Sequence, residues 1–426
     1  YLTGNPQITF FKVVYRRHTN FSMEAIQQTF SGTPAFGGQV TATISRNGDL
    51  VGRMYVEMNP SVIFATDGGD AVCVPSPAIT LLKEVECEIG GQRIDRYTSH
   101  WAGVWADLTE NTQLVKLNDT GFLAVADIKQ AGEEIVKAPN KFERMACHAK
   151  SFALSGGGTS SVSERYAAVP LNFWFCRNPG LALPLIALQY HEVKIKLTFE
   201  AATNLGATTS GDSIAMTGDL ASVKLWADYI YLDTDERRRF AQVSHEYLIE
   251  QLQYQTETAN KSKKVFDLNF NHPVKELIWS GRRDSGYGIH RGPASPVDLY
   301  GATLRQRQNT ADAAGEWSLK LNGHDRFSAR HSSYFTRTQV WQHHPNAGVG
   351  ITCADAISVY SFALKPEEHQ PSGTCNFSRI DNAQLSCSQA INTNSSIVDN
   401  HSLIIYAVNY NVLRIMSGMG GLAYSN

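Results

Sequence analysis

Charged residues are scarce in this sequence. Asp, Glu, Lys and Arg make up 18% of its 426 residues, below the roughly 25% usual for soluble domains. The net charge at pH 7 is −2, whereas proteins that bind nucleic acid through its phosphates carry a basic surface. The composition therefore argues against direct, sequence-specific binding of nucleic acid. Because few charges solvate the surface, we expect part of that surface to contact other protein.

The cysteine pattern lacks the signs of a disulfide scaffold. Seven cysteines occur without any C-x-x-C spacing, at positions 73, 87, 147, 176, 353, 375 and 387. Secreted scaffolds show an even count with regular spacing, so we expect free thiols in a reducing compartment. Because the first residue is Tyr1, we expect a short segment to precede it, and the printed sequence holds no signal peptide. The longest apolar stretch, 178–191, contains two prolines and is too short to span a bilayer.

Signatures of common catalytic sites are missing as well. The sequence has no G-K dipeptide for a phosphate-binding loop, no G-x-S-x-G elbow, no H-x-H pair and no H-E-x-x-H motif. His343 and His344 could in principle join Cys353 as the ligands of a metal ion. If the two histidines lie on a strand, however, their side chains point to opposite faces and cannot bind the same ion. The sequence thus predicts that the protein is not an enzyme, with no catalytic residue, metal ligand or cofactor.

Two further groups resemble site residues. Glu84, Glu86 and Glu88 alternate along one segment and share one face, as an acidic site would require, but we interpret them as a solvated strand face. His191 stands where a strand begins, and we interpret it as a surface or hydrogen-bonded histidine.

Alternating strand patterns dominate what is present. In residues 192–199, apolar side chains share one face and polar side chains share the other, and the same holds for 83–89, 316–321 and 404–412. A period of two with one polar face is typical of antiparallel sheets. The sequence therefore predicts an all-β protein built from sandwiches or jelly rolls.

Only two helices are indicated. Residues 99–110 place four large apolar residues at the i, i+3, i+4 and i+7 positions of a helix, with Ser99 available as the N-cap. Asp233 stands three residues before Glu236, as at the start of a capping box. The arginines at 237–239 then lie toward the C-terminal end of this short helix, where the helix dipole favours cations.

A weak internal repeat suggests two similar units. Residues 84–101 and 316–335 both contain an alternating strand, a glycine turn, a basic residue and an aromatic segment. Gly91 and Gly323 mark the two turns, 232 positions apart by subtraction. We expect a first domain over 1–233, a short helical connector over 234–245 and a second domain over 246–426.

Long polar stretches separate the strands. They are rich in Gly, Ser, Thr and Asn and cover residues 111–165, 201–219, 281–315, 343–356 and 388–401. Loops of this length carry function or form an outer surface. Asn-x-Ser/Thr sequons occur at Asn20, Asn118, Asn260, Asn376, Asn394 and Asn400. Without a signal peptide, most of these sequons are expected to be chance matches.

Eight blocks in order along the chain resemble one protein family. The blocks are "YLTGNPQITFFKVVYRRHTNF" (1–21), "ISRNGDL" (44–50), "EVECEIGGQRID" (84–95), "NPGLALPLIALQYHEVK" (178–194), "DYIYLDTDERRRFAQVSHEYLIEQLQ" (228–253), "LNGHDRF" (321–327), "YSFALKPEEHQPSGTCNFSRIDNA" (360–383) and "YAVNYNVLRIMSGMGGLAYSN" (406–426). They are similar to the major capsid proteins of nucleocytoplasmic large DNA viruses, of the phycodnavirus type that includes the chlorella viruses. Several blocks exceed ten residues, so the resemblance is specific.

This resemblance implies a fold and a structural function. Members of the family consist of two consecutive eight-stranded antiparallel jelly rolls with short helices in their loops. Three chains form a pseudo-hexagonal trimeric capsomer, and neighbouring capsomers tile an icosahedral shell over an internal membrane that encloses double-stranded DNA. The resemblance thus implies a homotrimer in the outer capsid of the virion, assembled in the host cytoplasm, with minor capsid proteins as further partners.

The resemblance also points to residues at both ends of the capsomer. The segment "ITFFKVV" (8–14) is expected to form the first strand, near the capsomer base that faces the particle interior. Arg16, Arg17 and His18 would then contact minor capsid proteins or lipid headgroups at the inner face. Chlorella-virus members carry covalent glycans on outer loops, outside the usual sequon. The late loop is the region expected to carry them here, with its candidate sites at Asn392, Asn394 and Asn400.

A second function stays open at the level of sequence. Jelly rolls also serve as lectins and cupins, so the alternative is a carbohydrate-binding or hydrolytic β-sandwich protein. That function requires aromatic residues or carboxylates clustered in one cleft, or a metal triad.

Overall fold

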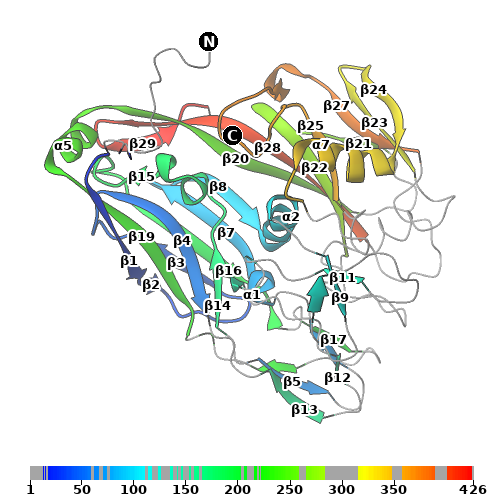
Figure 1. The fold of residues 1–426 in the computed structure, drawn as a ribbon, viewed down its shortest axis with the longest axis horizontal. Coiled ribbons are helices and arrows are strands. Elements are labelled where there is room, and N and C mark those ends of the chain that lie inside the picture. The colour runs from blue at the N-terminus through cyan, green and yellow to red at the C-terminus, as the bar shows by residue number, and fades with distance from the viewer. Residues whose placement is uncertain are drawn as a thin grey trace.

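A computed structural model shows a protein built almost entirely from antiparallel strands (Figure 1). The structure describes residues 13, 15, 18–58, 62–66, 71–73, 77–110, 114–117, 123–125, 135–137, 142, 145–146, 153–154, 158–162, 166–202, 206–208, 215–217, 220, 222–258, 265–283, 315–347, 357–388 and 401–424. Among these residues, no helix has the length and apolar character needed to cross a membrane. The all-β prediction is confirmed.

The N-terminal half packs two sheets against each other. The first sheet has the strand order β1 (Phe21–Gln28), β19 (Lys224–Leu232), β4 (Leu50–Met58) and β14 (Ala167–Pro170), with β15 (Leu183–Pro184) also paired to β4. The second has the order β2 (Phe30–Ser31), β3 (Gln39–Thr43), β16 (Val193–Phe199), β7 (Leu82–Ile89) and β8 (Gln92–Thr98). Every pairing is antiparallel.

The C-terminal half repeats this design. Its first sheet has the order β20 (His245–Thr258), β28 (His401–Met416), β22 (Pro273–Arg283) and β25 (Ile357–Ser361), with β26 (Cys375–Asn376) paired to β22 and β29 (Met419–Leu422) paired to β28. Its second sheet has the order β21 (Val265–Asp267), β27 (Ala383–Cys387), β23 (Glu316–Leu321) and β24 (His324–His331).

The two halves correspond strand by strand. In the first sheet of each half, β1, β19, β4 and β14 take the places of β20, β28, β22 and β25. In the second sheet, β3, β16, β7 and β8 take the places of β21, β27, β23 and β24. This order, in which the last strand lies between the first and third, is that of a double jelly roll. A count of eight strands per roll stays a prediction, because further short strands join the sheet edges.

The repeated hairpin explains the similarity seen in the sequence. Gly90 and Gly91 join β7 to β8 with φ of 59° and 81°, and Asn322 and Gly323 join β23 to β24 with φ of 50° and 79°. Two consecutive residues with positive φ form the tight turn whose twist matches that of a two-stranded ribbon, and glycine and asparagine adopt it at low cost. The internal repeat is therefore a repeat of structure.

Short strands and helices fill parts of the stretches that we expected to be loops. Three small sheets have the orders β10 (Leu123–Val125), β9 (Leu114–Leu117), β11 (Ile135–Lys137); β12 (Ala153–Leu154), β6 (Ala71–Cys73), β17 (Gly206–Thr208); and β13 (Gly158–Val162), β5 (Val62–Thr66), β18 (Ala215–Thr217). The expectation of plain loops over 111–165 and 201–219 is wrong in these places. Figure 1 shows the small sheets in the lower part of the molecule, away from α5 (Thr234–Gln242).

Short helices connect the strands. Besides α5, those with described bounds are α1 (Pro77–Leu81), α2 (Ser99–Thr109), α4 (Trp174–Arg177), η1 (Pro179–Leu181), the π-helical turn η3 (Tyr334–Thr338), α7 (Gln339–His343) and η4 (Phe377–Arg379). The N-cap of α2 is Thr98, whose hydroxyl accepts a hydrogen bond from Trp101 N, so our choice of Ser99 was one residue too late. Asp233 caps α5 as predicted, and its carboxylate accepts from Thr234 N at 2.7 Å.

The long strand β28 departs from the predicted pattern. All residues from Leu403 to Asn411 are buried, so both faces are covered, although we expected one polar face. Leu403, Ile405 and Ala407 pack into the core between the two sheets of the C-terminal half. Ile404, Tyr406 and Val408 pack into the other core, which contains the N-terminal half. The N-terminal half therefore covers the face that an isolated sandwich would expose to water.

Candidate functional site

The two halves meet along a buried interface that begins with aromatic side chains. The helix α2 and the strand β8 of the N-terminal half contact β20 and β28 of the C-terminal half. The rings of Trp101 on α2 and Tyr406 on β28 have centroids 4.9 Å apart, and the ring of Trp105 lies tilted against Trp101 with centroids 5.4 Å apart. Trp101 is 4% exposed and Tyr406 is fully buried, so this contact excludes water.

Hydrogen bonds fix the register of this interface. His100 Nδ1 lies 2.6 Å from the Tyr406 hydroxyl, and Gln251 donates from its amide to the Ile94 carbonyl. The Asp95 carboxylate accepts from Leu252 N at 3.2 Å. Burial raises the pKa of Asp95 to about 7, although the hydrogen bonds from the backbone amides of Leu252 and Arg96 oppose the shift. A buried carboxyl with this pKa takes up a proton near neutral pH.

A buried ionic cluster lies beside the interface. Lys275 is fully buried, and its Nζ lies 2.7 Å from Glu250 Oε1. Arg177 from α4 reaches the other oxygen of the same carboxylate at 3.2 Å, and its guanidinium stacks over the Trp105 ring at 5.1 Å. Lys275 and Glu250 belong to the C-terminal half and Arg177 to the N-terminal half, so this ion pair joins the two halves. Loss of one member would leave a buried charge without compensation.

A second buried cluster surrounds His344. Its Nε2 lies 3.1 Å from Glu276 and its Nδ1 lies 2.8 Å from Glu367. The Glu276 and Glu367 carboxylates together raise the pKa of His344 to about 9 against the effect of burial. The charge and hydrogen bond of His344 in turn lower the pKa of Glu276, although burial opposes this shift.

Sequence reasoning missed this cluster because it assigned the wrong element to the histidine pair. His343 ends α7 and His344 follows it as the C-cap, so the two residues are not on a strand. Cys353, the third member of the supposed metal site, lies outside the described residues. The partners Glu276 and Glu367 stand 68 and 23 positions away in the chain, and no local motif marks them. Within the described ranges, no group of three or more His, Cys, Asp or Glu side chains is arranged so that it could hold a metal ion.

Of the three residues expected to make inner-face contacts, the structure describes only His18. His18 is exposed, and its Nδ1 lies 3.0 Å from the Thr19 carbonyl oxygen. Arg16 and Arg17 lie outside the described residues, as do the glycan candidates Asn392, Asn394 and Asn400. Most of the segment 8–14, expected to be the first strand, also lies outside them. The first strand that the structure describes is β1.

The three glutamates of β7 form a ladder of ion pairs. Glu84 faces Arg96 at 3.9 Å, Glu86 faces Arg93 at 3.5 Å, and Glu88 contacts Lys196. Each carboxylate is partly buried beside a cation on a neighbouring strand, so the face is more enclosed than the solvated face we expected. These pairings stabilise the sheet by cross-strand attraction and leave no acidic site.

His191 holds the C-terminal hairpin against the N-terminal half. Its Nδ1 lies 2.9 Å from the Gly420 carbonyl and 3.2 Å from Gly420 N. The Tyr190 amide donates to the Gly418 carbonyl nearby. The interpretation of His191 as a hydrogen-bonded histidine is confirmed.

The four cysteines whose side chains the structure describes form no disulfide. They are Cys87, Cys176, Cys375 and Cys387. Burial raises the pKa of Cys176 to about 12 and that of Cys87 well above its usual value. A thiol with a raised pKa stays protonated at neutral pH and is a poor nucleophile. The side chains of Cys73, Cys147 and Cys353 lie outside the described part, so seven free thiols stay a prediction.

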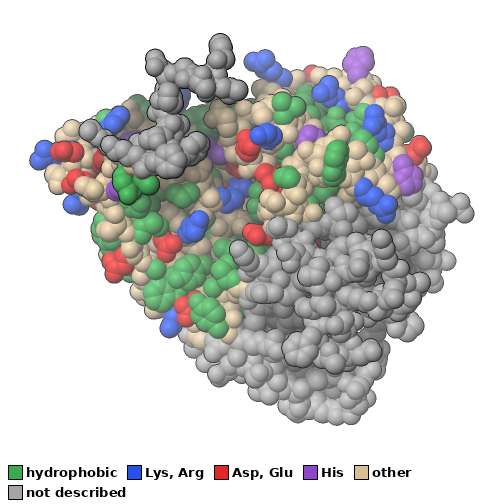
Figure 2. Space-filling model, in the orientation of Figure 1, with side chains coloured by type: hydrophobic (Ala, Val, Ile, Leu, Met, Phe, Trp, Pro, Cys, Tyr) green, Lys and Arg blue, Asp and Glu red, His purple; other side chains and the backbone are tan. Residues whose placement is uncertain are grey.

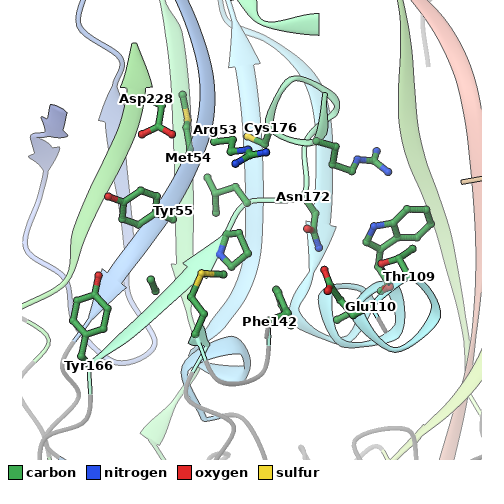
Figure 3. Close-up of a pocket in the computed structure, with 17 residues that line it drawn as sticks. Arg53, Met54, Tyr55, Thr109, Glu110, Phe142, Tyr166, Asn172, Cys176 and Asp228 are labelled. Atoms are coloured by element: carbon green, nitrogen blue, oxygen red, sulfur yellow. Dashed lines mark hydrogen bonds between the residues drawn. The ribbon is translucent and has the colours of Figure 1, made fainter. Parts of the chain in front are cut away.

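A hollow of about 720 Å³ opens on the outer face of the first sheet of the N-terminal half (Figure 3). In Figure 3, Tyr55, Tyr166 and Asp228 line one side, and Thr109 and Glu110 at the end of α2 line the other. The rest of the described lining consists of Arg53, Met54, Trp105, Ala106, Phe142, Met145, Ala168, Pro170, Leu171, Asn172, Cys176 and Arg177.

The lining of this hollow favours a protein contact over chemistry. Burial raises the pKa of Asp228, and the nearby Arg53 opposes the shift. The thiol of Cys176 donates to the Gly52 carbonyl at 3.7 Å and, being protonated, offers no nucleophile. Aromatic rings beside a few paired charges are typical of the centre of a protein interface.

The end of the molecule that carries α5 has mixed charge. Arg237 reaches back from α5 to Asp49 at 2.9 Å, and Arg414 pairs with Glu246 at 2.9 Å. Figure 2 shows side chains of both signs gathered at this end, while hydrophobic side chains gather over the strands of the N-terminal half. Arg237 of α5 therefore makes a local structural contact.

Comparison with family models matches both halves. Residues 9–233 match the model described as major capsid protein N-terminus, and residues 236–421 match the model described as large eukaryotic DNA virus major capsid protein. Together these matches span most of the chain.

Named relatives cover the whole length. The major capsid protein of Pyramimonas orientalis virus is 48% identical over 451 residues, covering 100% of this chain and 96% of the relative. The major capsid protein of Paramecium bursaria Chlorella virus 1 is 41% identical over 466 residues, with the same coverage.

Solved structures agree with these matches. A chain from the quasi-atomic model of the PBCV-1 virus capsid superposes with a TM-score of 0.70 at 37% identity, covering 98% of this chain and 100% of that one. The Faustovirus major capsid protein superposes with a TM-score of 0.68 at 13% identity, covering 96% and 93%, and this likeness shows the fold alone.

Proposed function

The chain belongs to the major capsid proteins of large eukaryotic DNA viruses, and from this premise we propose how it builds a shell. Its function is structural, as a capsid protein of the virion. We propose that three chains form a homotrimeric capsomer of pseudo-hexagonal outline, and that neighbouring capsomers tile an icosahedral shell.

The observation that carries this proposal is the repeated strand order of the two halves. Two similar sandwiches in one chain supply two similar wedges, so three chains supply six wedges for a ring. The exposed large apolar side chains, which include Trp341 at 77% and Phe21 at 58%, indicate surfaces that are not built to face water. A closed ring buries them and leaves no free wall from which a fibre could grow.

The trimer can be tested by mass. The chain has a mass of 47.0 kDa, so three copies give 141 kDa. Obligate interfaces bury roughly 2,000–5,000 Å², so we expect the purified protein to sediment as a trimer at micromolar concentration and in high salt. A well-folded 47.0 kDa monomer under these conditions would contradict the proposal. Electron microscopy of particles that contain this chain tests the shell itself.

We propose a division of the chain at α5. The first domain covers 1–233, the connector 234–245 and the second domain 246–426. The end of β19 at Leu232 and the start of β20 at His245 support this division, as do the family matches that end at 233 and begin at 236. Limited proteolysis with mass spectrometry tests it, because cleavage in the connector should release two fragments that each retain β-sheet structure.

The proposed partners at the inner face are minor capsid proteins and the headgroups of an internal membrane. The N-terminal segment with Arg16, Arg17 and His18 supplies basic side chains for either contact. Cross-linking of intact particles that carry His18→Cys should yield adducts with other virion proteins or with lipid. Adducts only with outer-surface reagents would contradict this orientation.

We further propose that any covalent glycan is attached to loops, with Asn392, Asn394 and Asn400 as candidates. Two asparagines of β28 support this view, because Asn409 and Asn411 are 0% and 2% exposed and leave no room for a sugar. The side chain of Asn376, one of the sequon asparagines, is engaged in capping η4, because it accepts a hydrogen bond from Ser378 N. Glycopeptide mapping that found sugar on β28 would contradict the proposal.

We propose that shell assembly takes place in the host cytoplasm. The four described free cysteines suit a reducing compartment. Immunoelectron microscopy of infected cells tests this, and assembling shells confined to the nucleus would contradict it. No described feature favours the carbohydrate-binding or hydrolytic alternative over this function.

A further inference from the structure

The contact between the two halves uses opposite sides of the repeated unit. The N-terminal half contributes β8 and α2, while the C-terminal half contributes β20 and β28. The counterparts of these elements are β24 with η3 and α7 in the C-terminal half, and β1 with β19 in the N-terminal half. Each chain therefore has one pair of sides that contact each other between its two halves, the used sides, and a corresponding pair of the same design that takes no part in that contact, the unused sides.

The unused sides are exposed where the used sides are buried. Nine residues of α2 are buried, whereas Trp341 on α7 is 77% exposed. Both faces of β28 are covered along Leu403–Asn411, whereas β1 exposes Phe21 at 58% and Met23 at 54%. Large apolar side chains at this exposure are costly in water, so the pattern indicates that a partner covers these sides.

The strand registers show which residues correspond. Both β4–β19 and β22–β28 contain a bulge that adds one residue to β4 or β22. Aligning the bulges without gaps makes Trp226 on β19 the counterpart of Tyr406 on β28. Tyr55 pairs with Trp226 and Ile278 pairs with Tyr406, so Tyr55 corresponds to Ile278. Pro170 on β14 pairs with Tyr55, and Val359 on β25 pairs with Ile278, so Pro170 corresponds to Val359.

The aligned residues place the hollow at a meaningful position. Tyr406, Ile278 and Val359 form the outer face of the C-terminal sheet, which packs in one core with Trp101 of α2. Tyr55 and Pro170 line the hollow on the outer face of the N-terminal sheet. The hollow thus lies where, in the other half, the aromatic residues of a neighbouring unit are seated.

We propose that Trp341 of one chain inserts into this hollow on a second copy of the same chain. The contact repeats between copies the packing that α2 makes within one chain, with η3 and α7 in place of α2. It is a head-to-tail contact, and such contacts close into a ring when the rotation allows. This inference rests on the proposed trimer and names the surface that forms it.

Charges at the two surfaces agree with this docking. The hollow contains the carboxylates of Glu110 and Asp228, and burial already raises the pKa of Asp228. Arg337 is exposed in the π-helical turn η3, four residues before Trp341 on α7. A cation beside the inserted ring would reach carboxylates at the rim, which favours one orientation of the two copies.

Substitution of the tryptophan provides a direct test. Trp341→Ala should weaken self-association by at least about 30-fold, because a buried tryptophan at the centre of an interface commonly contributes about 2 kcal/mol or more. Tyr190→Ala is the matched control, since Tyr190 is 75% exposed but lies beside the β28–β29 hairpin. Sedimentation over a dilution series measures both variants against the unsubstituted chain.

Cross-linking gives a second and positive readout. Tyr166 is 61% exposed and lines the hollow. A mixture of a Trp341→Cys chain with a Tyr166→Cys chain should form a covalent dimer with a short bismaleimide. Trp341→Cys mixed with Tyr190→Cys should not, and each single variant alone reports cross-links through native thiols.

The outcomes distinguish the docking surface from the trimer itself. If the unsubstituted chain is a trimer and Trp341→Ala associates as tightly, the surface is wrong while the trimer stands. Failure of the Trp341–Tyr166 pair to cross-link within a trimer likewise rejects the surface alone. If the unsubstituted chain is a monomer, both proposals fail. Loss of association in Trp341→Ala but not in Tyr190→Ala, together with the specific cross-link, supports the docking.

Discussion

The buried cluster at His344 should make stability depend on pH. His344 is enclosed between Glu276 and Glu367, and its pKa rises from 6.5 to about 9. A histidine with a raised pKa in the folded state stabilises fully below its unfolded pKa, and this stabilisation is lost as pH rises through the folded pKa. The loss should therefore fall between about pH 6.5 and pH 9.

The size of this effect follows from the shift. About 2.5 pKa units at roughly 1.36 kcal/mol per unit amount to about 3 kcal/mol. Replacing His344 by glutamine removes the cation and leaves Glu276 buried without its counterion. The loss of stability relative to the unsubstituted chain is therefore largest at pH values where His344 is charged. The difference in unfolding free energy between the unsubstituted chain and His344→Gln should thus shrink by about 3 kcal/mol from about pH 6 to about pH 9.5.

Urea unfolding followed by tryptophan fluorescence, at fixed protein concentration, measures this difference. His324→Gln serves as the control because His324 is exposed on β24, so its effect should be small and should not change with pH. Glu367→Gln should lower the midpoint of the pH dependence, because one of the two carboxylates that raise the pKa is gone. A difference for His344→Gln that stays constant across this pH range would refute the reasoning.

Three further predictions concern the interface and the thiols. The free energy of unfolding should fall as pH rises from about 4 to about 7, because over this range Asp95, with its folded pKa raised to about 7, retains its proton only in the folded state. Asp95→Asn should reduce this fall, and urea unfolding across the range checks it. Trp101→Ala should destabilise the chain by roughly 3–5 kcal/mol by leaving a cavity against Tyr406, and a calorimetric scan should show the two halves unfolding in separate steps. Thiol titration under denaturing, non-reducing conditions should find seven free groups, while Cys87 and Cys176 should react slowly in the native protein because they are buried; four or fewer free groups would contradict this.

The sequence was sufficient where structure follows from local pattern. The alternation in residues 192–199 predicts β16, whose residues Val193–Phe199 alternate between buried and half-buried. Asp233 before a run of charged residues predicts the cap of α5. The glycine turns at Gly91 and Gly323 indicate the internal repeat, because few residues adopt a positive φ without strain.

The sequence was insufficient where a distant segment sets the environment. The polar residues Asn409 and Asn411 suggest a solvent-facing side of β28, yet the N-terminal half covers that side. The histidine pair at 343–344 suggests a strand, although it ends a helix and pairs with carboxylates far along the chain. The hollow combines residues from β4, α2, β14, α4 and β19, and no single stretch of sequence carries its signature.

The position of β28 in the chain has a consequence for synthesis. This strand supplies side chains to both cores and is paired with β20, whose residues precede it by more than 140 positions. A ribosome makes the N-terminal half first, and domains generally fold as they emerge. The second sandwich, however, lacks its central strand until residues 401–416 have been made. Chains that stop short of this point cannot complete either core, so we expect truncated products to stay incompletely folded and open to proteolysis.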